Sequence, residues 1–142
     1  MIKLLDILKE NKTKVLVPRR SPEERQKNYQ IVLQKKIQQY IKNGGKGELD
    51  LNNTPITSLP NNLSVGGDLY LYSTKITSLP DNLQVGGGLY LNDTPITSLP
   101  DNLKVRDYLN LNNTPLSKKY TKGQIEQMVE DNGGYVKRNI YI

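Results

Sequence analysis

A twenty-residue unit repeats along the middle of this chain, and that repeat constrains the fold more than any other feature. The segments KGELDLNNTPITSLPNNLSV, GGDLYLYSTKITSLPDNLQV and GGGLYLNDTPITSLPDNLKV follow one another without a gap. Self-similarity at a fixed period is typical of a solenoid, in which each coil buries its apolar face only against its neighbours. We therefore predict a stack of coils over residues 47–116.

Apolar residues recur at six positions of the unit, and these columns are the predicted core. The Leu-x-Leu triplet alternates with period two, as a short strand with one buried face does. The Pro after the fourth column stops a ladder or a helix, so the second half of the unit is predicted to be a return path. Paired glycines then allow a turn into the next strand. The columns are Leu49/Leu69/Leu89/Leu109, Leu51/Leu71/Leu91/Leu111, Ile56/Ile76/Ile96/Leu116, Leu59/Leu79/Leu99, Leu63/Leu83/Leu103 and Val65/Val85/Val105.

The open ends of so short a stack would expose core residues, so we predict a cap at the N-terminal end. Residues 1–46 form this helical cap, with a short amphipathic helix over residues 2–10 and an extended segment at KVLVP. Ser21 and Glu24 have the spacing of a capping box and predict the start of a second helix. Its apolar stripe, which should cover the first coil, comprises Tyr29, Leu33, Ile37, Tyr40 and Ile41.

Residues 117–142 are predicted to form the second cap. The segment TKGQIEQMVEDNGG predicts a helix whose apolar side is Ile125, Met128 and Val129. The segment GGYVKRNIYI then repeats the Gly-Gly turn and ends with Ile-Tyr-Ile in place of Leu-x-Leu. We predict a fifth strand that closes the sheet, with Ile140 and Ile142 pointing inward. The fold class is a single-domain α+β solenoid of parallel strands, capped by helices at both ends.

The pattern L-x-L-x-x-T-x-I-t-x-L-P-x-x-L resembles the short, twenty-residue leucine-rich repeat found in bacterial and bacteriophage-encoded proteins. The resemblance covers about half of the chain, residues 47–116. The overall layout also resembles uncharacterised leucine-rich proteins of bacteriophages, which implies a phage origin and supplies no activity. One departure is Thr where the family has Asn, so we expect a ladder of Thr hydroxyls that bind backbone groups. Its members are Thr54, Thr74, Thr94 and Thr114.

The composition argues against catalysis. The chain has neither Cys nor His, which excludes disulfides, thiol nucleophiles, His-dependent triads and Cys/His metal sites. Carboxylates recur at the repeat spacing, such as Asp50 with Asp68 and Asp81 with Asp101. General acid–base work would need one of a pair to be buried, and every candidate is on an exposed position. We expect no enzyme, no metal and no cofactor.

The sequence also bears on location. No apolar stretch reaches the roughly 18 residues that a membrane span needs. The first residues, MIKLLDILKE, make a poor secretory signal because Asp6 interrupts the apolar run. We therefore expect a cytoplasmic protein with no membrane partner, in the host cytoplasm if the chain is phage-encoded.

The alternate positions of each Leu-x-Leu triplet should point outward and form an exposed strand face. Five of the nine tyrosines fall on this face. Tyr combines a large contact area with a low entropy cost and is enriched in binding hot spots. Exposed residues of the return path hardly change between coils, whereas those of the strand face vary, which fits adaptation to a ligand. We predict a non-catalytic module for protein–protein recognition. The predicted contact residues are Asp50, Asn52, Asp68, Tyr70, Tyr72, Tyr90, Asn92, Tyr108, Asn110 and Tyr141.

Other interpretations stay open. Cross-strand tyrosine pairs would stabilise a parallel sheet without any partner. Regularly spaced Thr suggests ice binding, although the Thr column is assigned to an internal ladder. A structural role in a virion is a further alternative, and neither the partner nor the oligomeric state is identified.

The charge distribution suggests a further alternative, nucleic-acid binding, although a solvated face of the N-terminal cap is the commoner explanation of a basic segment. Residues 1–46 carry twelve Lys and Arg against four Asp and Glu, a net +8, whereas residues 47–116 carry three against seven, a net −4. Such a basic segment would track the phosphate backbone of a nucleic acid. The candidate phosphate contacts are Arg19, Arg20, Arg25, Lys27, Lys35 and Lys36.

Overall fold

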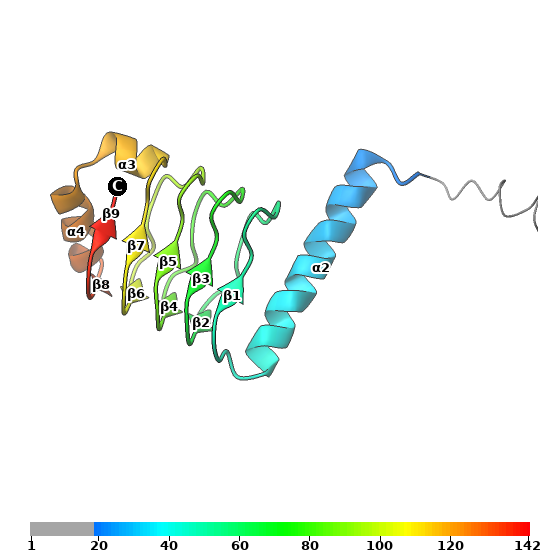
Figure 1. Cartoon of the computed structure of the whole chain (residues 1–142), viewed down its shortest axis with the longest axis horizontal. Helices are drawn as coiled ribbons and strands as arrows, with labels where there is room; N and C mark the ends of the chain where they lie inside the picture. Colours follow the sequence, from blue (N-terminus) through cyan, green and yellow to red (C-terminus); the bar gives the residue numbers. More distant parts are fainter. Residues whose placement is uncertain (1–18) are drawn as a thin grey trace, which may run out of the picture.

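The chain forms a solenoid of about three turns between helical caps, as a computed structural model of residues 19–142 shows (Figure 1). The helix and the extended segment predicted within residues 1–18 lie outside the described residues. The first sheet contains β1 (Leu49–Asp50), β3 (Leu69–Tyr70), β5 (Leu89–Tyr90), β7 (Leu109–Asn110) and β9 (Ile140–Tyr141). The second contains β2 (Ser64–Val65), β4 (Gln84–Val85), β6 (Lys104–Val105) and β8 (Tyr135–Val136).

Both sheets are parallel, and their register follows the repeat. The strand orders are β1-β3-β5-β7-β9 and β2-β4-β6-β8. Leu49 pairs with Leu69, and Leu69 with Leu89, so that equivalent residues of successive coils lie side by side. Ile140 continues the row next to Leu109, which confirms the predicted closing strand. The predicted solenoid of parallel strands with two caps is thus confirmed.

The second sheet was not predicted from the sequence. The return path contains a two-residue strand in each complete coil, and Val65, Val85 and Val105 point from these strands into the core. The prediction missed it because Pro60 and its copies stop pairing only locally. A few residues later the backbone is again free to pair with the same segment of the next coil.

The leucine columns fill one continuous core. Leu69 and Leu89 have no exposed surface, and the Ile56 and Leu63 columns are buried along the whole stack. Leu99 is the one member of the six columns that is only partly buried. The sequence therefore predicted the interior of the repeat region almost completely, because each coil has the same inward-facing positions.

Two polar columns fix the turns of each coil. Each hydroxyl of the Thr column donates to the Leu carbonyl three residues earlier in its own coil, at 2.6 Å for Thr54 and 2.7 Å for Thr74. The expected Thr ladder thus works within coils and does not link them. A ladder between coils exists at Asn62, Asn82 and Asn102, whose side-chain amides join at 3.2 and 3.0 Å. These Asn residues also have φ values of 58, 61 and 55°, a conformation that Asn tolerates better than most residues.

Helix α2 (Pro22–Lys42) closes the N-terminal end of the stack. Ser21 Oγ accepts from the Glu24 amide at 3.2 Å and Glu24 Oε2 accepts from the Ser21 amide at 3.1 Å, which confirms the capping box. Leu33 and Ile37 are buried as predicted. The predicted stripe is wrong at Tyr29 and Ile41, which are 50% and 41% exposed. Tyr29 lies in the N-terminal half of α2, and Figure 1 shows that this end of the helix slants away from the coils.

Tyr40 fastens the C-terminal end of α2 to the first coil. Its hydroxyl lies 2.7 Å from the carbonyl oxygens of both Gly45 and Gly47 and accepts from the Gly66 amide at 3.2 Å. Partial burial raises the pKa of this phenol, so it stays protonated and able to donate. One side chain thereby joins the cap to the backbone of the first two coils.

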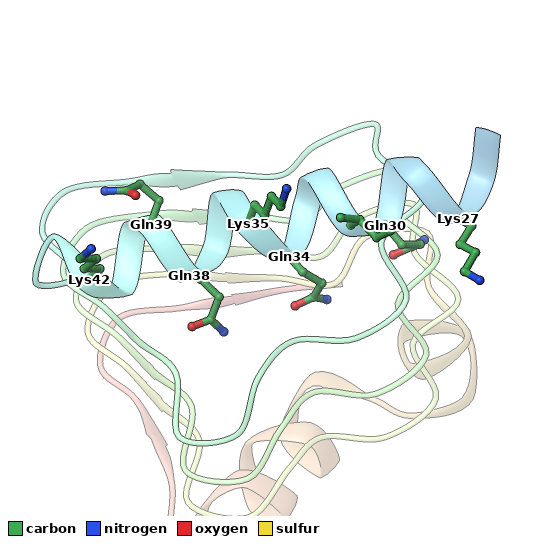
Figure 2. A pocket seen from close by; sticks show the side chains of 8 residues that line it. Lys27, Gln30, Gln34, Lys35, Gln38, Gln39 and Lys42 are labelled. Carbon is green, nitrogen blue, oxygen red and sulfur yellow. The ribbon is translucent and has the colours of Figure 1, made fainter. Parts of the chain in front are cut away.

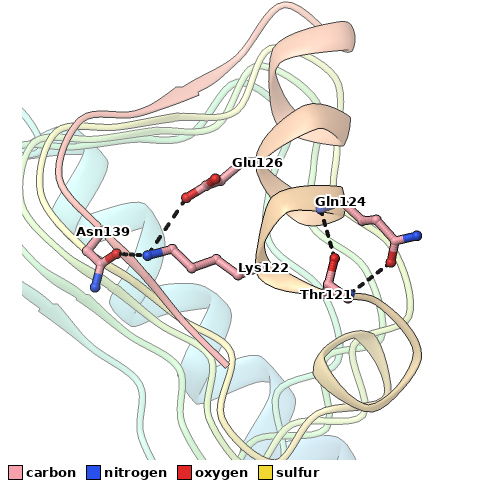
Figure 3. A network of polar contacts seen from close by, with 5 residues as sticks. All are labelled: Thr121, Lys122, Gln124, Glu126 and Asn139. Atoms are coloured by element: carbon pink, nitrogen blue, oxygen red, sulfur yellow. Dashed lines mark hydrogen bonds and ion pairs between the residues drawn. The ribbon is translucent and has the colours of Figure 1, made fainter.

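Two helices close the other end. Helices α3 (Pro115–Lys119) and α4 (Lys122–Asp131) together replace the return path of the last coil, and the sequence predicted the second of them but not the first. Ile125 and Val129 are buried and Met128 is partly buried, as predicted. In Figure 3, the Lys122 ammonium lies between Asn139 Oδ1, to which it donates, and Glu126 Oε1 at 3.9 Å.

Ile140 is buried in β9, but the prediction for Ile142 is wrong. Ile142 is 44% exposed because it lies past the end of the last strand, where a neighbouring coil flanks only one side. Neither α2 nor a shorter helix of the described residues has the long apolar stretch that crossing a bilayer would take.

Two glycines give a matched test of the close stacking. A Cβ on Gly86 would lie 2.2 Å from the Gly66 carbonyl oxygen, whereas one on Gly123 in α4 would meet no atom within 4 Å. We expect Gly86→Ala to lower the free energy of unfolding by about 1–3 kcal/mol or more. Gly123→Ala should raise it by a few tenths to about 1 kcal/mol, because Ala favours the helix.

Urea denaturation monitored by circular dichroism measures both effects. Equal midpoints for the Gly86→Ala and parent proteins would contradict the stacking described above.

Candidate functional site

The outward side of the first sheet, here called the tyrosine face, gathers the residues that the alternation predicts. Its middle row runs Asp50, Tyr70, Tyr90, Asn110 and Tyr141 from one coil to the next. Asp50 and Tyr141 are exposed, and the other three are half-buried. The flanking rows supply the rest of the face, which comprises Glu48, Asp68, Gly88 and Tyr108 on one side and Asn52, Tyr72, Asn92 and Asn112 on the other.

Four of the tyrosines form two aromatic pairs. The rings of Tyr70 and Tyr90 stack with their centroids 4.9 Å apart and their planes at 15°. Tyr108 and Tyr141 lie 5.6 Å apart at 46°. Gly88 makes the first pair possible, because a Cβ there would lie 2.9 Å from the Tyr90 ring. The Tyr90 ring therefore occupies the space above Gly88 that a side chain would fill.

Asp68 fixes the first pair. Its Oδ2 accepts a hydrogen bond from the Tyr70 hydroxyl at 3.0 Å, and its Oδ1 accepts one from the Gly88 amide at 2.7 Å. The hydrogen bond to Asp68, with smaller effects of burial and of nearby charges, raises the pKa of Tyr70 to about 12. Burial and the charge of Asp68 raise the pKa of Tyr90 as well. Both phenols stay neutral hydrogen-bond donors over the physiological range.

Arg138 holds the second pair and was not predicted as a site residue. Its Nε lies 2.9 Å from Asp107 Oδ1, and its Nη1 donates to the Tyr108 hydroxyl at 3.1 Å. The guanidinium carbon is 5.6 Å from the Tyr108 ring centroid, within cation–π range. The available signal was Asp107, which stands where the two preceding coils have Gly67 and Gly87. A charge in a glycine column needs a partner, and here that partner comes from the C-terminal cap.

Some predicted contact residues have a local structural role. Asp50 Oδ1 accepts from the Asn52 amide, and Asn110 Oδ1 from the Asn112 amide, each at 3.0 Å. These bonds close the turn after the strand, as Asx turns do. Asn92 donates at 3.0 Å to Asp93 at the next turn position. These polar residues of the face are therefore partly committed to the turns.

The predicted phosphate contacts do not converge on this face. Arg19, Arg20, Arg25, Lys27 and Lys35 are exposed at or along α2. Lys36 alone reaches the first sheet, where its ammonium donates to the Asp50 carbonyl at 2.5 Å. Figure 2 shows Lys27, Lys35 and Lys42 among glutamines on the outer surface of the helix. The cations form a strip along α2, where Lys27, Lys35 and Lys42 line an open pocket of about 750 Å³ together with glutamines and Ile31.

Within residues 19–142, no three acidic side chains lie close enough together to hold a metal ion. Asp81 and Asp101 are exposed, and Asp81 Oδ1 accepts from the Asp101 amide at 3.1 Å. The recurring carboxylates of the return path thus serve the stacking of coils.

Comparison of the chain with models of protein families, with curated proteins and with solved structures found no match. The functional argument therefore rests on the geometry of the surface itself.

The bond between Asp68 and Tyr70 predicts a measurable titration. Tyr70 should ionise near pH 12, and Asp68→Asn should return its pKa towards 10 because the negative acceptor is lost. A folded-state pKa above the unfolded one contributes stability that is present below pH 10 and is lost as pH rises towards 12. NMR of ring-labelled tyrosines, assigned with Tyr70→Phe, measures the shift, and unchanged titration in Asp68→Asn would contradict the assignment.

Proposed function

We propose that the chain is a non-catalytic recognition module that binds a protein partner through the tyrosine face. The observation that carries this proposal is the pair of tyrosine clusters, Tyr70 with Tyr90 and Tyr108 with Tyr141, on one exposed sheet surface. Tyrosines at the centre of an interface supply much of the binding energy of protein complexes. A sheet face with four ordered rings has the composition of such a centre.

Preorganisation supports the proposal. Binding normally costs entropy for each side chain that becomes fixed. Tyr70 is already held by Asp68, and Tyr108 by Arg138, before any partner arrives. These rings would therefore lose little freedom in a complex.

Unused hydrogen-bonding capacity distinguishes recognition from simple sheet stabilisation. Cross-strand stacking alone accounts for the ring of Tyr90 but not for its hydroxyl. Among the described residues, the hydroxyls of Tyr72, Tyr90 and Tyr141 have no hydrogen-bond partner. A phenol at an interface usually finds such a partner. Two of these free donors belong to the ring pairs and the third lies beside them, which favours a surface that a second molecule covers.

The biological setting is part of the same proposal. The Leu-x-Leu and Leu-Pro pattern supports membership of the bacteriophage type of leucine-rich repeat protein. A phage accessory protein that acts on a host protein in the host cytoplasm fits a small binding module without catalytic groups.

Single substitutions test the tyrosine face. A prey protein captured from bacterial lysate is purified, and its dissociation constant is measured with the parent and with Tyr70→Ala, Tyr90→Ala and Tyr108→Ala. A hot-spot tyrosine loses about 2 kcal/mol on truncation, so affinity should fall about thirtyfold for each of the central rings. Tyr29→Ala is the control, since Tyr29 is 50% exposed on α2.

Each variant is first shown to retain the circular dichroism spectrum of the parent. A prey that binds all three of these single variants as tightly as it binds the parent would exclude the tyrosine face as its site.

A further inference from the structure

The outward side of the second sheet contains a polar groove of about 250 Å³ that the proposed function does not use. Its row of outward strand residues reads Ser64, Gln84, Lys104 and Tyr135 in register, of which the first two are exposed and the last two half-buried. The row next to it begins with Gly66 and Gly86 and continues with Arg106. Small residues therefore form the floor of this second-sheet groove at the end near α2, and long side chains stand at the other end. It lies on a different side of the coil from the tyrosine face.

The glycines of the floor have a structural cause. A Cβ on Gly86 would lie 2.2 Å from the Gly66 carbonyl oxygen, so these coils stack too closely for a side chain. Arg106 occupies the equivalent position of the next coil. Its amide donates to the Val85 carbonyl, just as the Gly86 amide donates to the Val65 carbonyl. The stacking thus explains the glycines and leaves Arg106 without a structural reason.

Lys104 and Arg106 line this end of the groove without acidic partners, and a third cation, Lys137, lies beside it with its ammonium 5.8 Å from the Tyr135 ring centroid. Lys137 is the next residue of the Arg106 column. Its amide donates to the Val105 carbonyl, as the Arg106 amide donates to the Val85 carbonyl. In the described part of the chain, the ion pairs are Lys122–Glu126 and Arg138–Asp107, and neither includes Lys104, Arg106 or Lys137. No acidic residue lines the groove. Like charges brought together without a counter-charge raise the local potential and favour an anionic ligand.

This local charge is opposite to that of the surrounding repeats. Residues 47–116 have a net charge of −4 and hold three cations, Lys75, Lys104 and Arg106. Two of these three fall on one strand and the residue after it, at positions that are Ser, Gln or Gly in the two preceding coils. The coils are otherwise nearly identical, so these two positive charges are a local difference that the stacking of coils does not require.

The lining of the groove indicates which anion fits. A peptide ligand needs buried apolar anchors, and the exposed lining consists of hydroxyl, amide, ammonium and guanidinium groups with glycine backbone and one aromatic ring. Single-stranded nucleic acids bind through cations along the backbone and aromatic rings against the bases. We propose that the second-sheet groove binds a single strand of nucleic acid, with phosphates at Lys104, Arg106 and Lys137 and a base against Tyr135.

The repeat supplies a well-matched variant. Lys104→Gln with Arg106→Gly gives the third coil the residues of the second coil, Gln84 and Gly86, which the fold already accepts. Lys27→Gln with Lys35→Gln removes the same charge from α2 and tests the basic helix instead. Lys104→Gln with Arg106→Gln serves as a second groove variant that adds no glycine.

Fluorescence anisotropy with labelled single-stranded DNA and RNA of about 12 nucleotides measures binding by the full chain. Between about 50 and 200 mM salt, the slope of log K against log salt falls by roughly 0.7 for each phosphate that the protein no longer neutralises. Both groove variants should therefore lower the slope by about 1.4 and weaken binding, while the α2 variant keeps the parent slope.

Three outcomes would overturn the proposal. They are no binding of either oligonucleotide at the lower salt, loss of binding in the α2 variant with the groove variants unchanged, and tighter binding of an acidic peptide than of the oligonucleotides. A smaller salt-dependence slope in the groove variants alone supports the nucleic-acid proposal. This result is independent of how the tyrosine variants bind a protein partner.

Discussion

The contact between the backbones of neighbouring coils is the constraint on which the rest of this structure depends. The Leu69 amide donates to the Gly88 carbonyl at 2.9 Å and the Gly86 amide to the Val65 carbonyl at 2.7 Å, so each coil is joined to the next on two sides. Since parallel strands lie about 4.8 Å apart, every equivalent residue is brought beside its copy. The core columns, the Asn ladder and both outward faces follow from this spacing.

Much of the fold could be predicted because the repeat states the same information several times. The burial of Leu69 and Leu89, the capping box at Ser21 and the closing strand at Ile140 each follow from a local pattern. The second sheet was not predicted because the proline of each return path argues against a strand, whereas pairing between coils begins only a few residues after it. Tyr29 is exposed in the N-terminal half of α2, the end that slants away from the coils in Figure 1, and no local pattern encodes that slant.

The same contrast holds for the surface. The alternation of residues predicted that the tyrosines lie on the outward side of the first sheet. It could not predict the hydrogen bonds that fix their side chains. Asp68 was named as a site residue, and its bond to Tyr70 required the coordinates. Arg138 reaches Tyr108 from the cap, thirty residues further along the chain, and so lies outside any repeat pattern. Identical residues such as Asn82 mark where the turn needs them, and the residues that vary between coils are those that stacking leaves free.

Each cap is attached to the coils at its own end of the stack, and this separation has an evolutionary consequence. Tyr40 binds the backbone where the first coil begins and Arg138 binds the last coil, while the coils between them meet copies of themselves. Unequal crossing-over in the gene would insert or delete one whole coil and leave both attachments intact. The molecule would then lengthen in steps of about 4.8 Å, each step adding one row to both outer surfaces. The length of the solenoid could therefore change during evolution while both caps stay the same.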